Sequence, residues 1–140
     1  MASWLPRTPL PPRLLTLSRS TEPLLPGASA SLDFPGLGQL GHFVTISTDA
    51  PAWVSFYSSA AARQGDAGRP FSKDPPAGSG VLLDLATTAS ELTITAPPGG
   101  TYFSSEPPSS SPAPLRALVR NTGTARVAIA LSVNVLVLAP

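Results

Sequence analysis

The chain has 140 residues, of which 42% are hydrophobic and only 12% are charged, with a formal net charge of +1 and no cysteine. This length fits one domain around one core. The low, scattered charge gives no electrostatic footprint for a nucleic-acid backbone, so no nucleic acid is expected as a partner. The lack of cysteine excludes disulfides, thiolate metal sites and cysteine nucleophiles.

Residues 1–36 hold seven of the 18 prolines. Proline fixes φ and removes a hydrogen-bond donor, so this segment is not expected to form ladders along its length. A disordered tail is one interpretation, because chain ends are often loose. Its apolar side chains, among them Trp4, Leu14 and Leu15, are uncommon in disordered segments and favour an extended arm that lies along a neighbouring subunit. The early prolines also interrupt the apolar stretch of a signal peptide, so we expect the start to be retained.

From residue 41 onward, short alternating runs between Gly, Pro and Ser clusters are typical of an all-β domain. In the strand expected over 52–58, Val54 and Phe56 share one face while Trp53 and Tyr57 share the other. The links "TTAS" and "NTGT" predict hairpins between the strands that flank them. The expected strands cover 41–48, 52–58, 80–87, 91–97, 101–104, 115–120 and 125–139.

The last of these runs is the most regular, and its unbroken alternation predicts the central strand of a sheet. It is too short and too strictly alternating for a membrane helix, so no membrane partner is expected. The pattern as a whole predicts a single antiparallel β-sandwich over 37–140, jelly-roll or Ig-like in its connections, preceded by the proline-rich arm.

Side chains suited to catalysis are sparse and scattered. The one histidine, His42, has neither a nucleophile nor an orienting partner in the sequence around it. The carboxylates show no metal-ligand spacing. The glycines of "GLGQLG" lack the preceding strand and following helix of a phosphate loop. The sequence therefore predicts no enzyme, no metal and no cofactor.

The connection 58–80 is longer than a turn needs and carries three of the nine cationic side chains. Its "AAAR" can begin a helical turn, and Arg63 and Asp66 are close enough in sequence for a local ion pair. These charges either fold the loop back on itself or join the neighbouring aromatic side chains in an interface, where arginine and aromatic residues are enriched. The predicted interface residues are Trp53, Tyr57, Arg63, Asp66, Arg69 and Phe71, with Trp4, Leu14 and Leu15 on the arm.

The run "WVSFYSSAAARQGDAGRPFSKDPPAGSGVLLDLATT", with the terminal "ALVRNTGTARVAIALSVNVLVL", resembles a group of small virion proteins of tailed phages. The resemblance covers about 43–140 and implies a virion component of the head, neck, tail or fibre that is present in the host cytoplasm before assembly. It rests on Trp53, Phe56, Tyr57, Arg63, Asp66, Arg69, Gly80 and Asn121.

Together these observations predict a non-enzymatic structural protein. We expect it to form a symmetric homo-oligomer and to dock onto capsid or tail proteins through its arm and long loop. The alternative is a carbohydrate-binding module at a fibre or receptor-binding tip, with Trp53 or Tyr57 as a stacking platform for a glycan. That alternative depends on analogy between sandwich folds.

Overall fold

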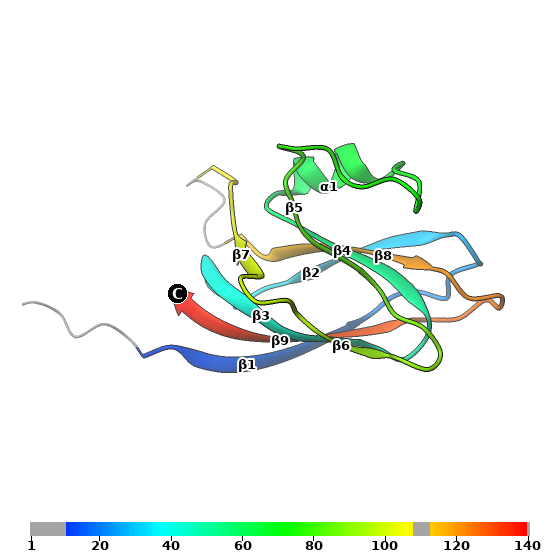
Figure 1. The fold of residues 1–140 in the computed structure, drawn as a ribbon, viewed down its shortest axis with the longest axis horizontal. Helices are drawn as coiled ribbons and strands as arrows, with labels where there is room; N and C mark the ends of the chain where they lie inside the picture. The colour runs from blue at the N-terminus through cyan, green and yellow to red at the C-terminus, as the bar shows by residue number, and fades with distance from the viewer. Residues whose placement is uncertain (1–10, 108–112, 140) are drawn as a thin grey trace, which may run out of the picture.

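The computed structural model describes residues 11–107 and 113–139, which form two antiparallel sheets packed face to face (Figure 1). The first sheet contains β1 (Arg13–Ser20), β9 (Ala130–Ala139), β3 (Leu40–Thr48) and β6 (Thr93–Thr95), with β7 (Thr101–Phe103) also paired to β3. The second sheet contains β2 (Ser29–Phe34), β8 (Leu115–Asn121), β4 (Ala52–Tyr57) and β5 (Val81–Ala86). A short helix, α1 (Ala60–Asp66), follows β4. The predicted all-β sandwich is confirmed.

The strand pairs are nested along the chain. Strand β4 pairs with β5, β3 with β6, β2 with β8, and β1 with β9. The chain therefore behaves as one long antiparallel ribbon that is wound into two sheets, with strand orders 1-9-3-6 and 2-8-4-5. This is the arrangement of a jelly roll, with β7 as a short addition. The loop 58–80 joins the innermost pair and forms the tip of the ribbon.

Both predicted hairpins are wrong. The strands that flank "TTAS" are β5 of the second sheet and β6 of the first, and the strands that flank "NTGT" are β8 and β9, which also lie in different sheets. Alternation shows that one face of a strand is buried, but it does not tell which sheet the strand joins. A link of about four residues is long enough to cross the roughly 10 Å between packed sheets. Strand β9 lies between β1 and β3, so the predicted central strand is confirmed.

The predicted arm over 1–36 is wrong for residues 13–34. Residues 13–20 form β1, which pairs along its whole length with β9, and residues 29–34 form β2, which pairs with β8. The prolines of this region stand outside the two strands and therefore remove no donor from their ladders. The sandwich thus begins well before the boundary predicted at residue 37. Residues 1–10, Trp4 among them, lie outside the described residues.

The core lies between the sheets and is rich in aromatic and β-branched side chains. The ring centroid of Phe43 lies 4.9 Å from that of Phe56 and 5.4 Å from that of Tyr102. The Tyr102 hydroxyl donates to the Leu37 carbonyl oxygen at 2.6 Å. Burial raises the pKa of Tyr102 to about 12. Burying each large apolar side chain stabilises the fold by about 1.5–3 kcal/mol.

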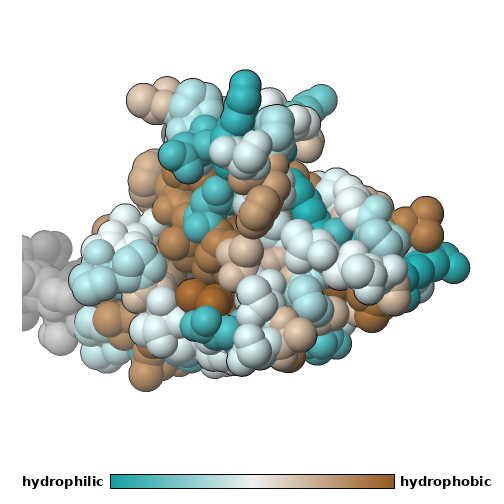
Figure 2. All heavy atoms as spheres, turned by 45° about the vertical axis from the view of Figure 1, so that its right-hand side comes forward, coloured by the Kyte–Doolittle hydropathy of each residue, from teal (hydrophilic) through white to brown (hydrophobic). Residues whose placement is uncertain are grey.

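The outer faces of the two sheets differ in what covers them. Helix α1 and its loop lie over the second sheet, whereas no described element lies over the outer face of the first (Figure 1). In the space-filling view the loop region rises above the body, with hydrophilic side chains at its top and hydrophobic ones where it meets the body (Figure 2). All six residues of β4 are buried, because both of its faces are covered. In the described ranges, no helix is long and apolar enough to cross a membrane.

Candidate functional site

The long loop is pinned at both of its ends. Ser59 caps α1 by accepting a hydrogen bond from the Ala62 amide at 3.0 Å, as expected for serine at an N-cap. The Ser58 amide donates to the Gly80 carbonyl oxygen at 2.9 Å. Gly80 has a φ of +83°, and a Cβ added there would lie 2.6 Å from the Ala62 Cβ. The helical turn predicted from "AAAR" is confirmed, and a glycine at position 80 lets the loop close against it.

Beneath the loop lies a group of polar side chains that we call the buried ion cluster. Its members come from β4, β5, β8, α1 and the segment that follows α1: Trp53, Ser55, Tyr57, Asp66, Arg69, Asp84 and Arg120. With two arginines and two aspartates, its formal charges balance. The side chains of Asp66, Arg69 and Arg120 are less than one-tenth exposed, whereas that of Asp84 is 26% exposed. Charges as deeply buried as the first three are tolerated only because they are paired and hydrogen-bonded.

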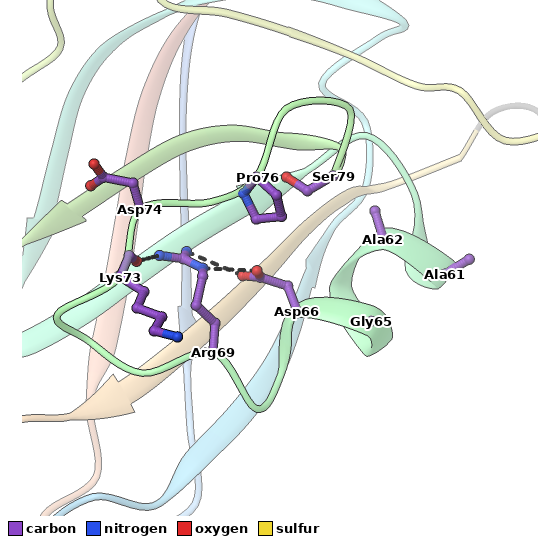
Figure 3. A pocket seen from close by; sticks show the side chains of 9 residues that line it. All are labelled: Ala61, Ala62, Gly65, Asp66, Arg69, Lys73, Asp74, Pro76 and Ser79. Carbon is purple, nitrogen blue, oxygen red and sulfur yellow. Dashed lines mark hydrogen bonds and ion pairs between the residues drawn. The ribbon is translucent and has the colours of Figure 1, made fainter.

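Arg69 joins the two carboxylates of this cluster. Its Nε donates to Asp66 Oδ1 at 2.8 Å, its Nη2 donates to Asp66 Oδ2 at 3.2 Å, and its Nη1 lies 3.1 Å from Asp84 Oδ2. Nη1 also donates to the Lys73 carbonyl oxygen at 2.7 Å, which holds the far side of the loop (Figure 3). The side chain of Arg69 is only 6% exposed, and that of Asp66 only 4%. The pair therefore attaches the loop to the sheet from the inside.

Neutral donors from β4 complete the coordination of the carboxylates. Trp53 Nε1 and Ser55 Oγ both donate to Asp84 Oδ1 at 2.6 Å, and the Tyr57 hydroxyl donates to Asp66 Oδ2 at 2.6 Å. Burial alone would raise the pKa of each aspartate, but hydrogen bonds outweigh it, chiefly from Arg69, and both pKa values are lowered. Burial, together with the hydrogen bond to Asp66, raises the pKa of Tyr57. Both carboxylates are thus held ionised and Tyr57 is held neutral.

Arg120 forms the floor of the cluster. The centre of its guanidinium lies 3.5 Å from the centroid of the Trp53 ring, which is a close cation–π contact. Its Nη1 donates to Ser55 Oγ at 3.1 Å, and its Nη2 lies 3.6 Å from Asp66 Oδ2. Its Nε is buried without a hydrogen-bond partner among the described residues. The sequence analysis did not predict Arg120 as a site residue. Its position on the polar face of an alternating strand could have indicated it.

A second group of charges ties α1 to the edge of the same sheet. Arg63 Nη1 donates to Asp33 Oδ1 at 2.7 Å and Arg116 Nη1 to Asp33 Oδ2 at 3.0 Å. Arg116 also holds both carboxylate oxygens of Glu106, at 3.0 and 3.1 Å. The predicted ion pair between Arg63 and Asp66 is wrong, because Asp66 turns toward the sheet while Arg63 reaches β2.

Two hollows flank the loop. One, of about 430 Å³, lies between α1 and residues 73–79 (Figure 3). The other, which we call the Phe71 groove, has a volume of about 670 Å³ and lies between the loop and the outer face of the second sheet. Its lining includes Trp53, Phe71 and Arg120, together with Ser29, Ala86 and Thr122. Phe71 is 63% exposed, and its ring lies nearly perpendicular to that of Trp53, with an interplanar angle of 80° and ring centroids 5.2 Å apart.

The structure does not bring the predicted interface residues together on one surface. The buried ion cluster contains four of them, Trp53, Tyr57, Asp66 and Arg69. Asp66 and Arg69 pair with each other and fold the loop back on itself, which is the first of the two interpretations given for these charges. Of the predicted residues in the described ranges, Phe71 and Leu14 are the large hydrophobic side chains left exposed, and they lie over different sheets. Leu15 packs against the core.

No protein-family model matches the chain, and no curated protein matches it either. Among residues 11–107 and 113–139, no group of three or more His, Cys, Asp or Glu side chains could hold a metal ion. The fold and the buried ion cluster define a jelly-roll protein whose long loop is locked onto one sheet.

Proposed function

We propose that this chain is a non-enzymatic structural protein of a phage particle, which assembles as a symmetric oligomer and docks onto a capsid or tail protein. The observation that carries the proposal is the locked loop. Ion pairs fix the loop to the sheet while its Phe71 ring stands exposed at the rim of a groove. A pre-organised protrusion loses little conformational entropy on binding, and aromatic side chains are enriched at contact centres.

One further observation supports the virion setting, namely that the sequence of residues 43–140 resembles small virion proteins of tailed phages. Jelly rolls occur in viral capsid domains. Lectin domains share this fold, so the fold by itself favours neither function.

The carbohydrate-binding alternative loses its proposed platform. Trp53 is 5% exposed and Tyr57 is 1% exposed. One face of the Trp53 ring is covered by Arg120. Neither ring therefore presents the open face that a stacked sugar needs, and no other observation favours this alternative.

Mass spectrometry of phage particles purified from the source culture tests the proposal directly. We expect peptides of this chain in the particle fraction, at a fixed ratio to the major capsid or tail proteins after repeated density-gradient purification. Loss of the chain during purification, or its recovery only in the soluble lysate, would overturn the virion assignment.

The role of the loop is tested with Phe71→Ala and with Leu25→Ala as its matched control. The two side chains are similarly exposed, at 63% and 61%, but Leu25 lies in a different loop. We expect tagged Phe71→Ala protein, produced during infection, to be recovered from particles in clearly lower amounts, while Leu25→Ala is recovered like the wild type. Thermal melting of both variants should stay near that of the wild type. Equal incorporation of the two variants would remove the loop from the docking surface.

A further inference from the structure

The four edges of the sandwich differ in how they are protected against pairing with another chain. Strands β6 and β7 are only three residues long. Strand β5 carries Asp84 in its middle and pairs with β4 through an irregular register. Strand β2 is six residues long and has Asp33 bound by two arginines. Short strands, bulges and charges of this kind are the usual means of blocking edge-to-edge association.

Strand β1 is the least protected of the four edges, because its only such device is one arginine near each end. It is eight residues long, contains no proline or glycine, and pairs with β9 over Arg13–Ser20 without a register shift. Its other edge has no partner strand among the described residues. Six of its eight residues are exposed, and its charges are confined to Arg13 and Arg19. A long, regular, open edge is a template for another strand.

We propose that β1 pairs antiparallel with β1 of a second copy of this chain about a two-fold axis, so that the two first sheets join into one continuous sheet. This rests on the symmetric oligomer of the proposed function and names the surface that forms it. An isologous contact of this type is self-complementary and closes as a dimer.

The backbone determines which residues can bond across this edge. The Thr21 amide donates to the Ile129 carbonyl oxygen at 2.9 Å and continues the ladder between β1 and β9. Because successive residues point their backbone groups to opposite sides, odd-numbered residues of β1 face β9 and even-numbered ones face the open edge. The amides and carbonyls of β1 that no other described strand bonds, and that can therefore bond a second copy, are those of Leu14, Thr16, Ser18 and Ser20.

Side-chain charges then select the register. A continuous sheet requires even residues opposite even residues, because a shift by one would exchange the inner and outer faces. An axis at Thr16 would place Arg13 opposite Arg19 of the second copy, twice, which is unfavourable. An axis at Leu17 avoids this contact. It pairs Thr16 with Ser18 and Leu14 with Ser20 of the second copy. All the backbone amides and carbonyls on the open edge of β1 then have a partner. Leu17 then faces its own symmetry mate.

Charge insertion on β1 tests the dimer. In the double variant Thr16→Lys, Ser18→Lys each new ammonium group lies opposite one of the second copy, which we expect to weaken the dimer roughly tenfold or more. The matched control is Thr93→Lys, Thr95→Lys, which places the same charges at exposed positions of β6, in the same sheet. Sedimentation velocity over a range of concentrations gives the dissociation constants, with circular dichroism as a check of folding.

A cysteine cross-link tests the register independently, since the chain has no cysteine of its own. Opposed residues of a non-hydrogen-bonded pair lie about 4.5 Å apart, within disulfide range. We expect Leu17→Cys to form a disulfide-linked dimer on mild oxidation. Leu15→Cys, on the same face but opposite Arg19 of the second copy, should form far less.

A wild type that stays monomeric at all concentrations, or a β1 lysine variant that dimerises as well as the β6 control, would overturn the inference. Equal cross-linking at positions 15 and 17 would overturn the register. The particle experiment is separate from these outcomes. If the chain is found in particles but forms no β1 dimer, the virion assignment stands and the dimer is rejected. If the β1 dimer forms but the chain is absent from particles, the dimer stands and the virion assignment is rejected.

Discussion

The outer faces of the two sheets show two ways of completing a sandwich. The second sheet carries ionised side chains on its outer side, and a loop of the chain itself covers and pairs with them. The first sheet presents side chains that alternate with its core residues and include no carboxylate, lysine or arginine: Leu14, Thr16, Ser18, His42, Thr45, Ser47, Thr93, Thr95, Ser132, Asn134 and Leu136. A charged face requires a partner for each charge, whereas a hydroxyl-lined face can stay in water until another molecule meets it.

This contrast indicates where substitutions should lower the free energy of unfolding most. On the second sheet, each buried charge depends on its neighbours, so one substitution leaves others unpaired. On the first sheet, hydrogen bonds between exposed hydroxyl groups, such as that between Ser47 and Thr93 at 2.9 Å, compete with water and contribute little.

The largest effect is expected from Arg69→Ala. It leaves Asp66 and Asp84 without their main cationic partner and should lower the free energy of unfolding by about 3–5 kcal/mol. Urea denaturation followed by tryptophan fluorescence measures the loss. The control Arg126→Ala removes an exposed arginine and should change the value by less than about 0.5 kcal/mol. A similar loss in both variants would contradict the distinction between the two faces.

A smaller effect, of about 1–3 kcal/mol, is expected from Gly80→Ala. The new Cβ meets both an unfavourable φ of +83° and the Ala62 side chain. Gly99→Ala is a close control, because Gly99 has the same φ of +83° but nothing within 4 Å of the added Cβ. The difference between the two unfolding free energies isolates the contact at the base of the loop, and no difference would mean that the loop simply shifts away.

Acid should weaken the second sheet through the two lowered aspartate pKa values. Both carboxylates bind protons more weakly in the folded state than in the unfolded one. Their contribution is therefore fully present above the unfolded pKa of about 3.9 and is lost as the pH falls below it. Urea midpoints measured between about pH 6 and about pH 2 should fall steeply for the wild type and less steeply for Arg69→Ala. Parallel curves would show that the cluster does not set the acid limit.

The smallest effect is expected from Ser47→Ala on the bare face of the first sheet. It removes one exposed hydroxyl contact and should cost about 0.5 kcal/mol or less. Chemical denaturation of wild type and variant side by side checks this. A loss comparable with that of Arg69→Ala would mean that the hydroxyl-lined face is a cooperative network.

The sequence predicts the faces of single strands well and their partners poorly. The assignment of Val54 and Phe56 to one side of β4 and of Trp53 and Tyr57 to the other is confirmed, because the two-residue period is a local property. The pairing of β1 with β9 is not local, and nothing in either strand alone indicates it. The links "TTAS" and "NTGT" were predicted to close hairpins, but the nested pairing makes each of them connect one sheet to the other.

The same limit explains the errors at the candidate site. Arg63 was assigned a partner three residues away, while its true partner Asp33 lay in a segment interpreted as an arm. Arg120 lies opposite Trp53 in the register of β4 and β8, far from it in sequence. Local spacing could identify Asp66 and Arg69 as a pair, but the cluster around them comes from strands that meet only in the folded sheet.

The nested ribbon also has a consequence for how the protein is made. The innermost pair, β4 and β5, closes over the shortest stretch of chain, while β1 must wait for β9, the last strand of the sandwich in chain order. Because closing longer loops costs more entropy, folding that begins at the ribbon tip and proceeds outward is favoured. Strand β1 is then unpaired on both sides until β9 has been synthesised, and only then does it gain its inner neighbour.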